Sequence, residues 1–439
     1  MKRIGFLLTL LLLSSFFLSG CSVPAAASAS DSSAPVAEVP AATQAAAAKP
    51  LEMMRGPQGF ASNEYASADG MRIIECLNLN DNGPHLMTFY DFNAMEQRVL
   101  CKKAGCAHRD ETCPAYMPTT YQEDRVQCNL LGIVDGVLYW TMCEGSFGTY
   151  TSVVFQKQVL DGSSFPETIA QLDPADWKNA WPGAVFCDGE NFYMIQRRSV
   201  FARIALDDGT ITTAVPELPG GEFGGQFLGV SADGKAVYAS SLDNGEPLQL
   251  FGLDSLGHVE PLFTLPDNAG FMSFWQGLLY YCNVQDGSIY AFDPVTKETQ
   301  LLTTALAPYA RVRPGDYYEA SGWQFKRFGD WLFVDDVRLE ENSDDCWRVG
   351  VNLATGEVRS DLELGGFWIG SVHPIIIWAE TPRGLLVTPE QPRFVFHTRG
   401  SGGSPYDQET QYPTYAFLSL EDYLANRPNY RQIASLPHN

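Results

Sequence analysis

Short runs of apolar and β-branched residues, separated by turn residues, recur along the chain, and the stretch from Gln276 to Thr304 shows this pattern most clearly. Within it, turns rich in Gly, Asp and Pro separate three runs, which cover residues 276–284, 288–293 and 299–302. Runs of this length between such turns predict β-strands joined by hairpins. Three short strands cannot bury a core by themselves, so the unit is expected to repeat along the chain.

The repeat is marked by a glycine that immediately precedes or begins a β-rich run. Seven such glycines lie 43 to 66 residues apart, at positions Gly70, Gly136, Gly189, Gly234, Gly277, Gly329 and Gly384. A four-stranded propeller blade needs about 40 to 45 residues, and longer intervals leave room for loops. The pattern therefore predicts an all-β fold, a single β-propeller with seven blades of four antiparallel strands, over residues 51–439. A pair of β-sandwiches also uses short strands, but the regular recurrence favours the propeller.

Closure of the ring and the helical content can also be predicted. An open ring leaves two unpaired sheet edges, so the segments before Gly70 and after Gly384 are expected to share one sheet. The candidate strands for this closure are Met53 to Ala66 and Tyr412 to Leu418. The best candidate for a helix is short, from Glu421 to Asn426.

The N-terminus carries an export signal. Met1-Lys2-Arg3 precedes an apolar run from Ile4 to Leu18, which is too short for a membrane-spanning helix. The run ends in Leu18-Ser19-Gly20-Cys21, which resembles a bacterial lipobox. Residues 1–20 are therefore predicted to be a lipoprotein signal peptide, and Cys21 the lipidated first residue of the mature chain. The alternative is an ordinary signal peptide with an incidental cysteine.

Residues 21–50 contain little besides Ala, Ser, Pro and Val, so they cannot bury enough surface to fold. They are predicted to be a low-complexity tether that holds the propeller at the cell membrane, facing outside the cell. The formal charge of −23 argues against nucleic acid as a partner and against extended contact with anionic lipid. The expected partners are the membrane, through the N-terminal lipid, and an extracellular protein or glycan.

Two further stretches resemble a known group of proteins. They are Leu100 to Tyr116, which contains Cys-x4-Cys-x-His-x4-Cys, and Tyr415 to Tyr430. With the repeats between them, these stretches resemble the uncharacterised β-propeller lipoproteins of Gram-positive anaerobic bacteria. The resemblance implies a propeller at the cell surface, and the family offers no established activity.

The cysteine-rich stretch has three interpretations, which are disulfide bonds, a zinc site and free thiols. Cysteines of exported proteins commonly form disulfides, and the disulfide candidates are Cys101, Cys106, Cys113, Cys76, Cys128 and Cys143. The alternative is a zinc site made of Cys101, Cys106, His108 and Cys113, although the spacing departs from the common zinc modules. The export signal and the unusual spacing favour the disulfide, so no metal and no cofactor are expected.

The sequence leaves two classes of function open. It contains no Gly-x-Ser-x-Gly and no His-Glu-x-x-His motif, which favours a binding or scaffold module that uses one propeller face over an enzyme. The alternative is a carbohydrate-active or other hydrolytic enzyme with carboxylates at the mouth of the channel. The acidic stretch from Glu340 to Asp345 is interpreted as a solvated hairpin tip and less readily as a calcium loop.

Overall fold

The computed structural model of the chain describes residues 47–55, 64–76, 85–117, 126–146, 149–177, 184–196, 199–220, 225–240, 247–313, 317–318, 324–337, 347–368, 371–389, 393–399, 405–411 and 414–437. The chain divides into two compact units, Met1–Ala47 and Ala48–Asn439. The predicted signal peptide, Cys21 and nearly all of the tether lie outside the described residues. No helix in the described part of the chain is long and apolar enough to cross a membrane.

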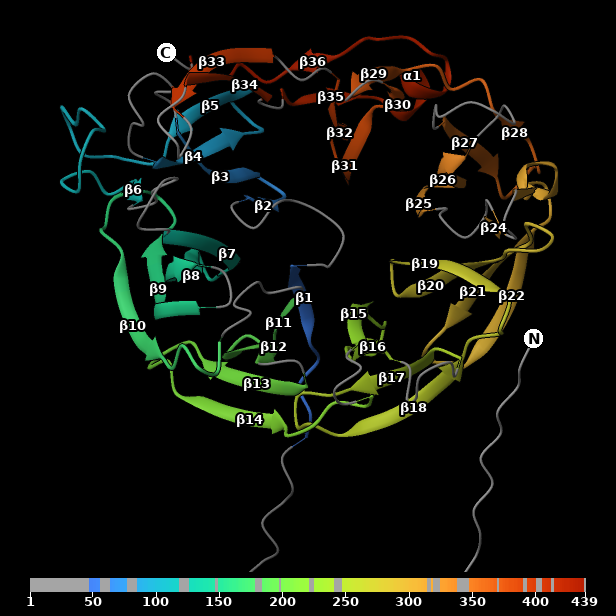
Figure 1. Ribbon diagram of the computed structural model, residues 1–439, viewed down its shortest axis with the longest axis horizontal. Helices are drawn as coiled ribbons and strands as arrows, with labels where there is room; N and C mark the ends of the chain where they lie inside the picture. Colours follow the sequence, from blue (N-terminus) through green and yellow to red (C-terminus); the bar gives the residue numbers. More distant parts are fainter. Residues whose placement is uncertain are drawn as a thin grey trace, which may run out of the picture. The chain divides into compact units, whose positions relative to one another are not determined.

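The second unit is a seven-bladed β-propeller, as predicted (Figure 1). Blade 1 contains β2 (Glu64–Ser67), β3 (Gly70–Cys76), β4 (His85–Asp91), β5 (Glu96–Val99) and β6 (Tyr116–Met117). Blade 2 contains β7 (Val126–Val134), β8 (Val137–Ser146), β9 (Thr149–Val159) and β10 (Glu167–Leu172). Blade 3 contains β1 (Glu52–Arg55), β11 (Val185–Cys187), β12 (Asn191–Gln196), β13 (Val200–Ala205) and β14 (Ile211–Val215).

The remaining four blades follow in chain order. Blade 4 contains β15 (Gly225–Val230), β16 (Ala236–Ser240), β17 (Gln249–Leu253) and β18 (Val259–Thr264). Blade 5 contains β19 (Ala269–Trp275), β20 (Leu278–Asn283), β21 (Ile289–Asp293) and β22 (Glu298–Thr303). Blade 6 contains β25 (Gln324–Phe328), β26 (Trp331–Val337), β27 (Trp347–Asn352) and β28 (Val358–Arg359). Blade 7 contains β31 (Ile376–Thr381), β32 (Gly384–Thr388), β35 (Ala416–Leu418) and β36 (Arg431–Gln432).

Three two-stranded hairpins, one α-helix and one 3₁₀-helix (Ala307–Tyr309) complete the described elements. The hairpins are β23 (Val312–Arg313) with β24 (Tyr317–Tyr318), β29 (Gly365–Trp368) with β30 (Ser371–Pro374), and β33 (Arg393–Arg399) with β34 (Pro405–Gln411). The helix α1 (Leu420–Leu424) overlaps the expected helical segment, Glu421 to Asn426, but begins one residue earlier and ends two residues earlier. Ser419 caps it, because the Ser419 side chain accepts a hydrogen bond from the Asp422 N–H at 3.0 Å.

All seven predicted turn glycines lie at the turn between the first and second core strands of a blade. At two of these turns both central residues have positive φ, 49° and 75° for Asp135-Gly136 and 49° and 82° for Gln276-Gly277. Such turns match the twist of the strands they join. Gly70 is needed for space instead, because a Cβ there would lie 2.2 Å from Cε2 of Phe89.

The antiparallel order of the strands gives the ring two different faces. The turns between first and second strands, and between third and fourth, open on one side, which we call the short-turn face. The segments from one blade to the next, and from second to third strands, open on the other side. This long-connection face receives, among others, the described residues 173–177, 304–313, 360–368, 393–399 and 405–411.

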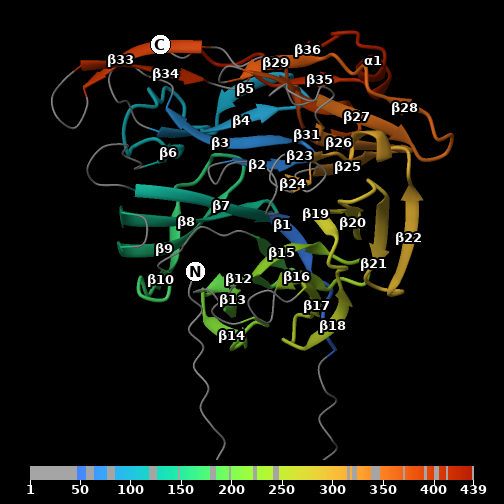
Figure 2. The same cartoon turned by 45° about the vertical axis from the view of Figure 1, so that its right-hand side comes forward.

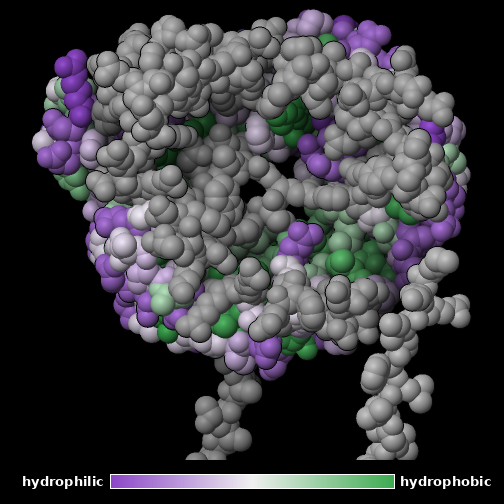
Figure 3. Space-filling model, viewed as in Figure 1, coloured by the Kyte–Doolittle hydropathy of each residue, from purple (hydrophilic) through white to green (hydrophobic). Residues whose placement is uncertain are grey.

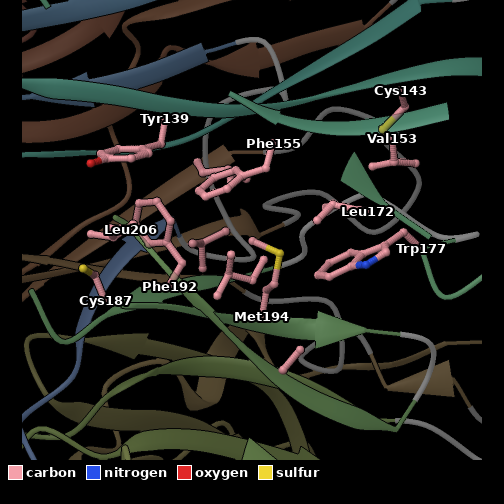
Figure 4. Close-up of a cluster of buried hydrophobic side chains, with 14 of the residues drawn as sticks. Tyr139, Cys143, Val153, Phe155, Leu172, Trp177, Cys187, Phe192, Met194 and Leu206 are labelled. Atoms are coloured by element: carbon pink, nitrogen blue, oxygen red, sulfur yellow. The ribbon is translucent and has the colours of Figure 1, made fainter. Parts of the chain in front are cut away.

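The core lies between neighbouring blades, and each of the seven interfaces has its own cluster of buried side chains. Figure 4 shows the cluster between blades 2 and 3, where the ring of Tyr139 stacks on Phe155 at 5.9 Å and meets Phe192 edge-on at 5.3 Å. Cys143 and Cys187 are buried in the same cluster. Figure 3 shows hydrophilic described residues mainly at the outer edge of the ring.

The predicted closure is wrong in its form, because the two candidate segments do not share a sheet. In the first segment, β1 pairs with β11 of blade 3 and β2 pairs with β3, whereas β35 pairs with β32 and β36 of blade 7. The seam is spanned instead by the C-terminal segment. The N–H of Gln97 donates to the carbonyl of Ala434 at 2.7 Å, and the N–H of Ala434 donates to the carbonyl of Met95 at 3.0 Å.

The strand β1 fixes the start of the second unit to blades 3 and 4 on the short-turn face. The N–H of Lys49 donates to Oγ of Ser255 at 2.8 Å, and Nζ of Lys49 pairs with Glu190 at 2.5 Å. The N–H of Leu51 donates to the carbonyl of Gly234 at 2.8 Å. The strand then runs along the inner edge of blade 3, as Figures 1 and 2 both show.

Blades 6 and 7 are joined by a buried ionic network around Arg348, whose side chain is 2% exposed. Arg348 donates to both carboxylate oxygens of Asp335 on the neighbouring strand, at 3.0 Å for Nη2 to Oδ2. Its Nη1 also donates to the carbonyl of Ile375 at 3.1 Å and to Oη of Tyr423 at 3.0 Å. Burial alone would raise the pKa of Asp335, but the adjacent Arg348 and Lys326 hold that pKa below its ordinary value.

Replacing Arg348 by Met should lower the free energy of unfolding by about 3 kcal/mol, because the buried Asp335 loses its bidentate partner and keeps only Lys326, whose Nζ lies 3.4 Å from Oδ2. The matched control is Arg359→Met, which removes a surface pair with Asp361 worth about 0–1 kcal/mol. Denaturant unfolding at neutral pH measures both values. Equal effects of the two substitutions would contradict the network's role.

The same pair of proteins should respond differently to acid. In the wild type, the lowered pKa of Asp335 stabilises the fold above the unfolded pKa of about 3.9, and this contribution is lost as the pH falls through the folded pKa. In Arg348→Met, the buried carboxyl can take a proton and relieve the penalty. The stability difference between the two proteins should therefore shrink from pH 7 to pH 4, as measured by denaturant midpoints, and a difference independent of pH would refute this account.

Candidate metal centre

The cysteine-rich stretch is an insertion in the outermost strand of blade 1. The strand is split, because β5 ends at Val99 and β6 resumes the pairing with β4 at Tyr116. The two residues that flank the break, Leu100 and Ala115, both form backbone hydrogen bonds with Met87. The N–H of Leu100 donates to the carbonyl of Met87 at 2.9 Å, and the N–H of Met87 donates to the carbonyl of Ala115 at 2.8 Å. The cysteine loop, residues 101–114, therefore leaves and rejoins the sheet opposite Met87.

The cysteine loop also contacts blade 2. The N–H of Lys102 donates to the carbonyl of Gly162 at 3.0 Å, and Nζ of Lys102 pairs with Asp161 at 2.9 Å. Nε2 of the buried Gln158 donates to the carbonyl of Pro114 at 2.8 Å. Gly162 has a φ of 74°, and a Cβ there would lie 2.6 Å from the carbonyl oxygen of Leu100. The cysteine loop and the β9–β10 turn therefore pack closely against each other.

Turns within the loop bring four side chains together. The ligand atoms of Cys101, Cys106, His108 and Cys113 all lie within 4.8 Å of one another, and Nδ1 of His108 is 3.3 Å from Sγ of Cys113. The N–H of Cys106 donates to the carbonyl of Lys103 at 3.2 Å, across a turn in which Gly105 has a φ of 69°. His108 itself has a φ of 55°, which is uncommon outside glycine.

The sulfur atoms of the loop differ in environment. The backbone N–H of His108 donates to Cys106, and this hydrogen bond holds the pKa of Cys106 below its usual value. Cys113 is 1% exposed, and burial raises the pKa of its thiol to about 12. Cys106 therefore loses its proton more readily than an ordinary cysteine, whereas Cys113 needs a nearby cation to lose its proton.

The expected disulfides do not appear among the described cysteines, and none of Cys101, Cys106, Cys113, Cys128 and Cys143 is bonded to another. Cys128 and Cys143 lie on β7 and β8, where burial raises the pKa of both thiols, and they belong to the cores between blades. The side chain of Cys76 lies outside the described residues. The structure thus brings together the four residues of the zinc alternative, Cys101, Cys106, His108 and Cys113.

The arrangement determines what chemistry a bound metal could do. Three sulfurs and one imidazole nitrogen are a common ligand set for tetrahedral zinc. Four protein ligands fill every position of such an ion, so no position remains for water or substrate. The centre can therefore hold a structural ion and offers no open site for catalysis. The other candidate cation site, Glu340 to Asp345, lies outside the described residues.

The comparisons with known proteins assign the chain to no family. No protein-family model and no curated protein matches the chain. Among solved structures, the GH74 xyloglucanase from Xanthomonas campestris is 11% identical, with a TM-score of 0.41 over 88% of this chain and 62% of that one. An oligogalacturonate lyase in complex with manganese is 11% identical, with a TM-score of 0.38 over 62% of this chain and 72% of that one. At these values the similarities carry no argument about function.

Alkylation should rank the described thiols by pKa and exposure. In protein freed of metal with a chelator at pH 8, Cys106 should react with iodoacetamide before Cys113 and Cys128, because it has more thiolate and is less buried. Peptide mass spectrometry after a timed reaction gives the order, with unfolded protein as the control in which the three react at similar rates. Faster reaction of Cys113 would contradict this order.

Proposed function

We propose that the chain is a cell-surface lipoprotein that uses the long-connection face of its propeller to bind an extracellular protein or glycan. The observation that carries the proposal is the unequal construction of the two faces. The hairpins β23–β24, β29–β30 and β33–β34 all interrupt connections on the long-connection face, in blades 5 to 7. Loops on a rigid scaffold are where binding residues concentrate, so this face is the better candidate for recognition.

The attachment of the tether supports the same assignment. The second unit begins on the short-turn face, where Lys49 and Leu51 are bonded to the turns at Glu190, Gly234 and Ser255. A lipid on Cys21 would therefore be connected to the propeller through that face. The long-connection face then stays clear of the attachment point and is free to meet a partner outside the membrane.

The negative charge of the chain limits the classes of partner that it can bind. With a formal charge of −23, the chain repels polyanions, so nucleic acid and anionic lipid surfaces are poor partners. Neutral glycans and proteins with a basic surface remain, and glycans are the class we favour for the first test. Aromatic residues on propeller loops can stack on sugar rings, and the chain contains 12% aromatic residues.

Anchoring is tested by the substitution Cys21→Ala. Without the sulfur that carries the lipid, the protein should accumulate in the medium or remain unprocessed, whereas the wild type should fractionate with membranes. Fractionation followed by immunoblotting measures the distribution, and Cys282→Ala is the control for loss of an unrelated cysteine. Unchanged membrane association of Cys21→Ala would refute the lipoprotein assignment.

Binding is tested with the unlipidated Cys21→Ala chain on arrays of glycans and peptidoglycan fragments. One variant replaces residues 390–412, which contain the hairpin β33–β34, by a short Gly-Ser linker. The matched control replaces the turn 294–297 on the short-turn face in the same way. We expect glycan binding that is lost in the first variant and kept in the second.

The reverse result, loss only in the second variant, would place binding on the other face and overturn the proposal. Release of a shortened glycan from the array would instead identify a hydrolase. Circular dichroism and thermal unfolding establish that each variant keeps the propeller fold.

A further inference from the structure

We propose that Cys101, Cys106, His108 and Cys113 bind one Zn²⁺ ion, and that this ion fastens the split outer strand of blade 1 to blade 2. The inference is independent of the function proposed for the propeller face. It rests on the convergence of four ligand atoms within 4.8 Å in a loop that packing holds weakly.

The geometry is close to what a tetrahedral zinc ion requires. Zn–S bonds of about 2.3 Å at tetrahedral angles place sulfur atoms about 3.8 Å apart. The ligand atoms here lie within 4.8 Å of one another, so adjustments of about 1 Å or less would bring them to bonding distance. Nδ1 of His108 and Sγ of Cys113 are already 3.3 Å apart.

The ligand count favours metal over a disulfide. A disulfide would use two of the three sulfurs and leave a thiol and an imidazole in contact beside it. A zinc ion uses all four groups. With three thiolates and a neutral imidazole the site would carry one net negative charge, and Lys103 supplies a positive charge within the loop. Its Nζ is held there by the carbonyl of Thr112 at 2.6 Å.

The apolar residues of the cysteine loop bury too little surface to hold the loop in place by packing alone. Between Lys102 and Thr112 most residues are exposed, and none of them belongs to a strand. Cys113 of the loop belongs to the buried cluster between blades 1 and 2, and Cys101 and Cys106 pack against that cluster. Three of the four residues that would bind zinc are therefore the ones that attach the loop to the core. A metal ion there would fix both ends of the loop and its contacts with Gly162 and Gln158.

The first test is metal content of the full chain, purified without chelator from zinc-supplemented medium. We expect about one zinc per chain by inductively coupled plasma mass spectrometry, and an X-ray absorption spectrum with three sulfur and one nitrogen neighbours. His108→Ala should lose the zinc, whereas His108→Cys should retain it, because a thiolate can replace the imidazole. Cys187→Ser, a buried cysteine of blade 3, is the matched control and should keep one zinc.

The second test follows the loop itself, so that a folding defect of a variant cannot obscure the result. Removing zinc from the wild type with a chelator should speed tryptic cleavage at Lys102, Lys103 and Arg109 at least several-fold, and added zinc should restore protection. Protein without zinc whose intact mass rises by about two hydrogens on reduction would show a disulfide and overturn the proposal. One zinc per chain in His108→Ala, or cleavage unaffected by chelation, would also overturn it.

Discussion

The structure depends on the packing of each sheet against the next one. A four-stranded sheet of this size has two faces to cover, and no blade has enough strands to fold back on itself. Each of the seven interfaces therefore holds its own apolar cluster, and aromatic rings recur in them, as at Tyr139 with Phe192 and Trp275 with Phe328. Both faces of every blade are covered only when all seven interfaces form, including the one between the first and last blades.

The interface between blades 1 and 7 is not closed by a sheet that the two blades share. Among the strands that the structure describes, none is exchanged between blades 1 and 7. Tyr90 meets Tyr415 edge-on at 5.0 Å and Phe92 meets Phe417 at 5.1 Å, and the C-terminal segment crosses from β35 to β5. The side chain of Gln97 extends the crossing, because its Oε1 accepts from the N–H of Leu436 at 2.8 Å. Apolar packing and a short parallel contact thus replace a shared sheet.

The sequence was sufficient to predict the blades, because their signals are local. A turn glycine and its flanking β-rich residues lie within one hairpin, so Gly136 or Gly277 identifies its turn without knowledge of the rest of the chain. The contacts that could not be predicted join distant residues. Leu51 bonds to Gly234, and Ala434 bonds to Gln97, and no spacing pattern signals either pairing.

The candidate metal centre could be predicted from the sequence only in part. Its four residues were identified as a group, but their spacing did not match a familiar zinc module, and the export signal favoured disulfides. What the sequence could not reveal is the path of the loop. Positive φ values at Gly105 and His108 and the return of the chain opposite Met87 bring the side chains together. Those features appear only when the loop is folded onto its two blades.

The central claim of this account is that the ring is closed by the C-terminal segment and the aromatic contacts at the seam. Hydrogen exchange of a variant ending at Gln432 tests it most directly, because the variant removes Ile433, Ala434 and Leu436 and leaves every blade strand in place. We predict faster exchange in β4, β5 and β35, with β16 and β20 on the far side of the ring much less affected. Exchange in β5 and β35 equal to that of the full chain would contradict the account.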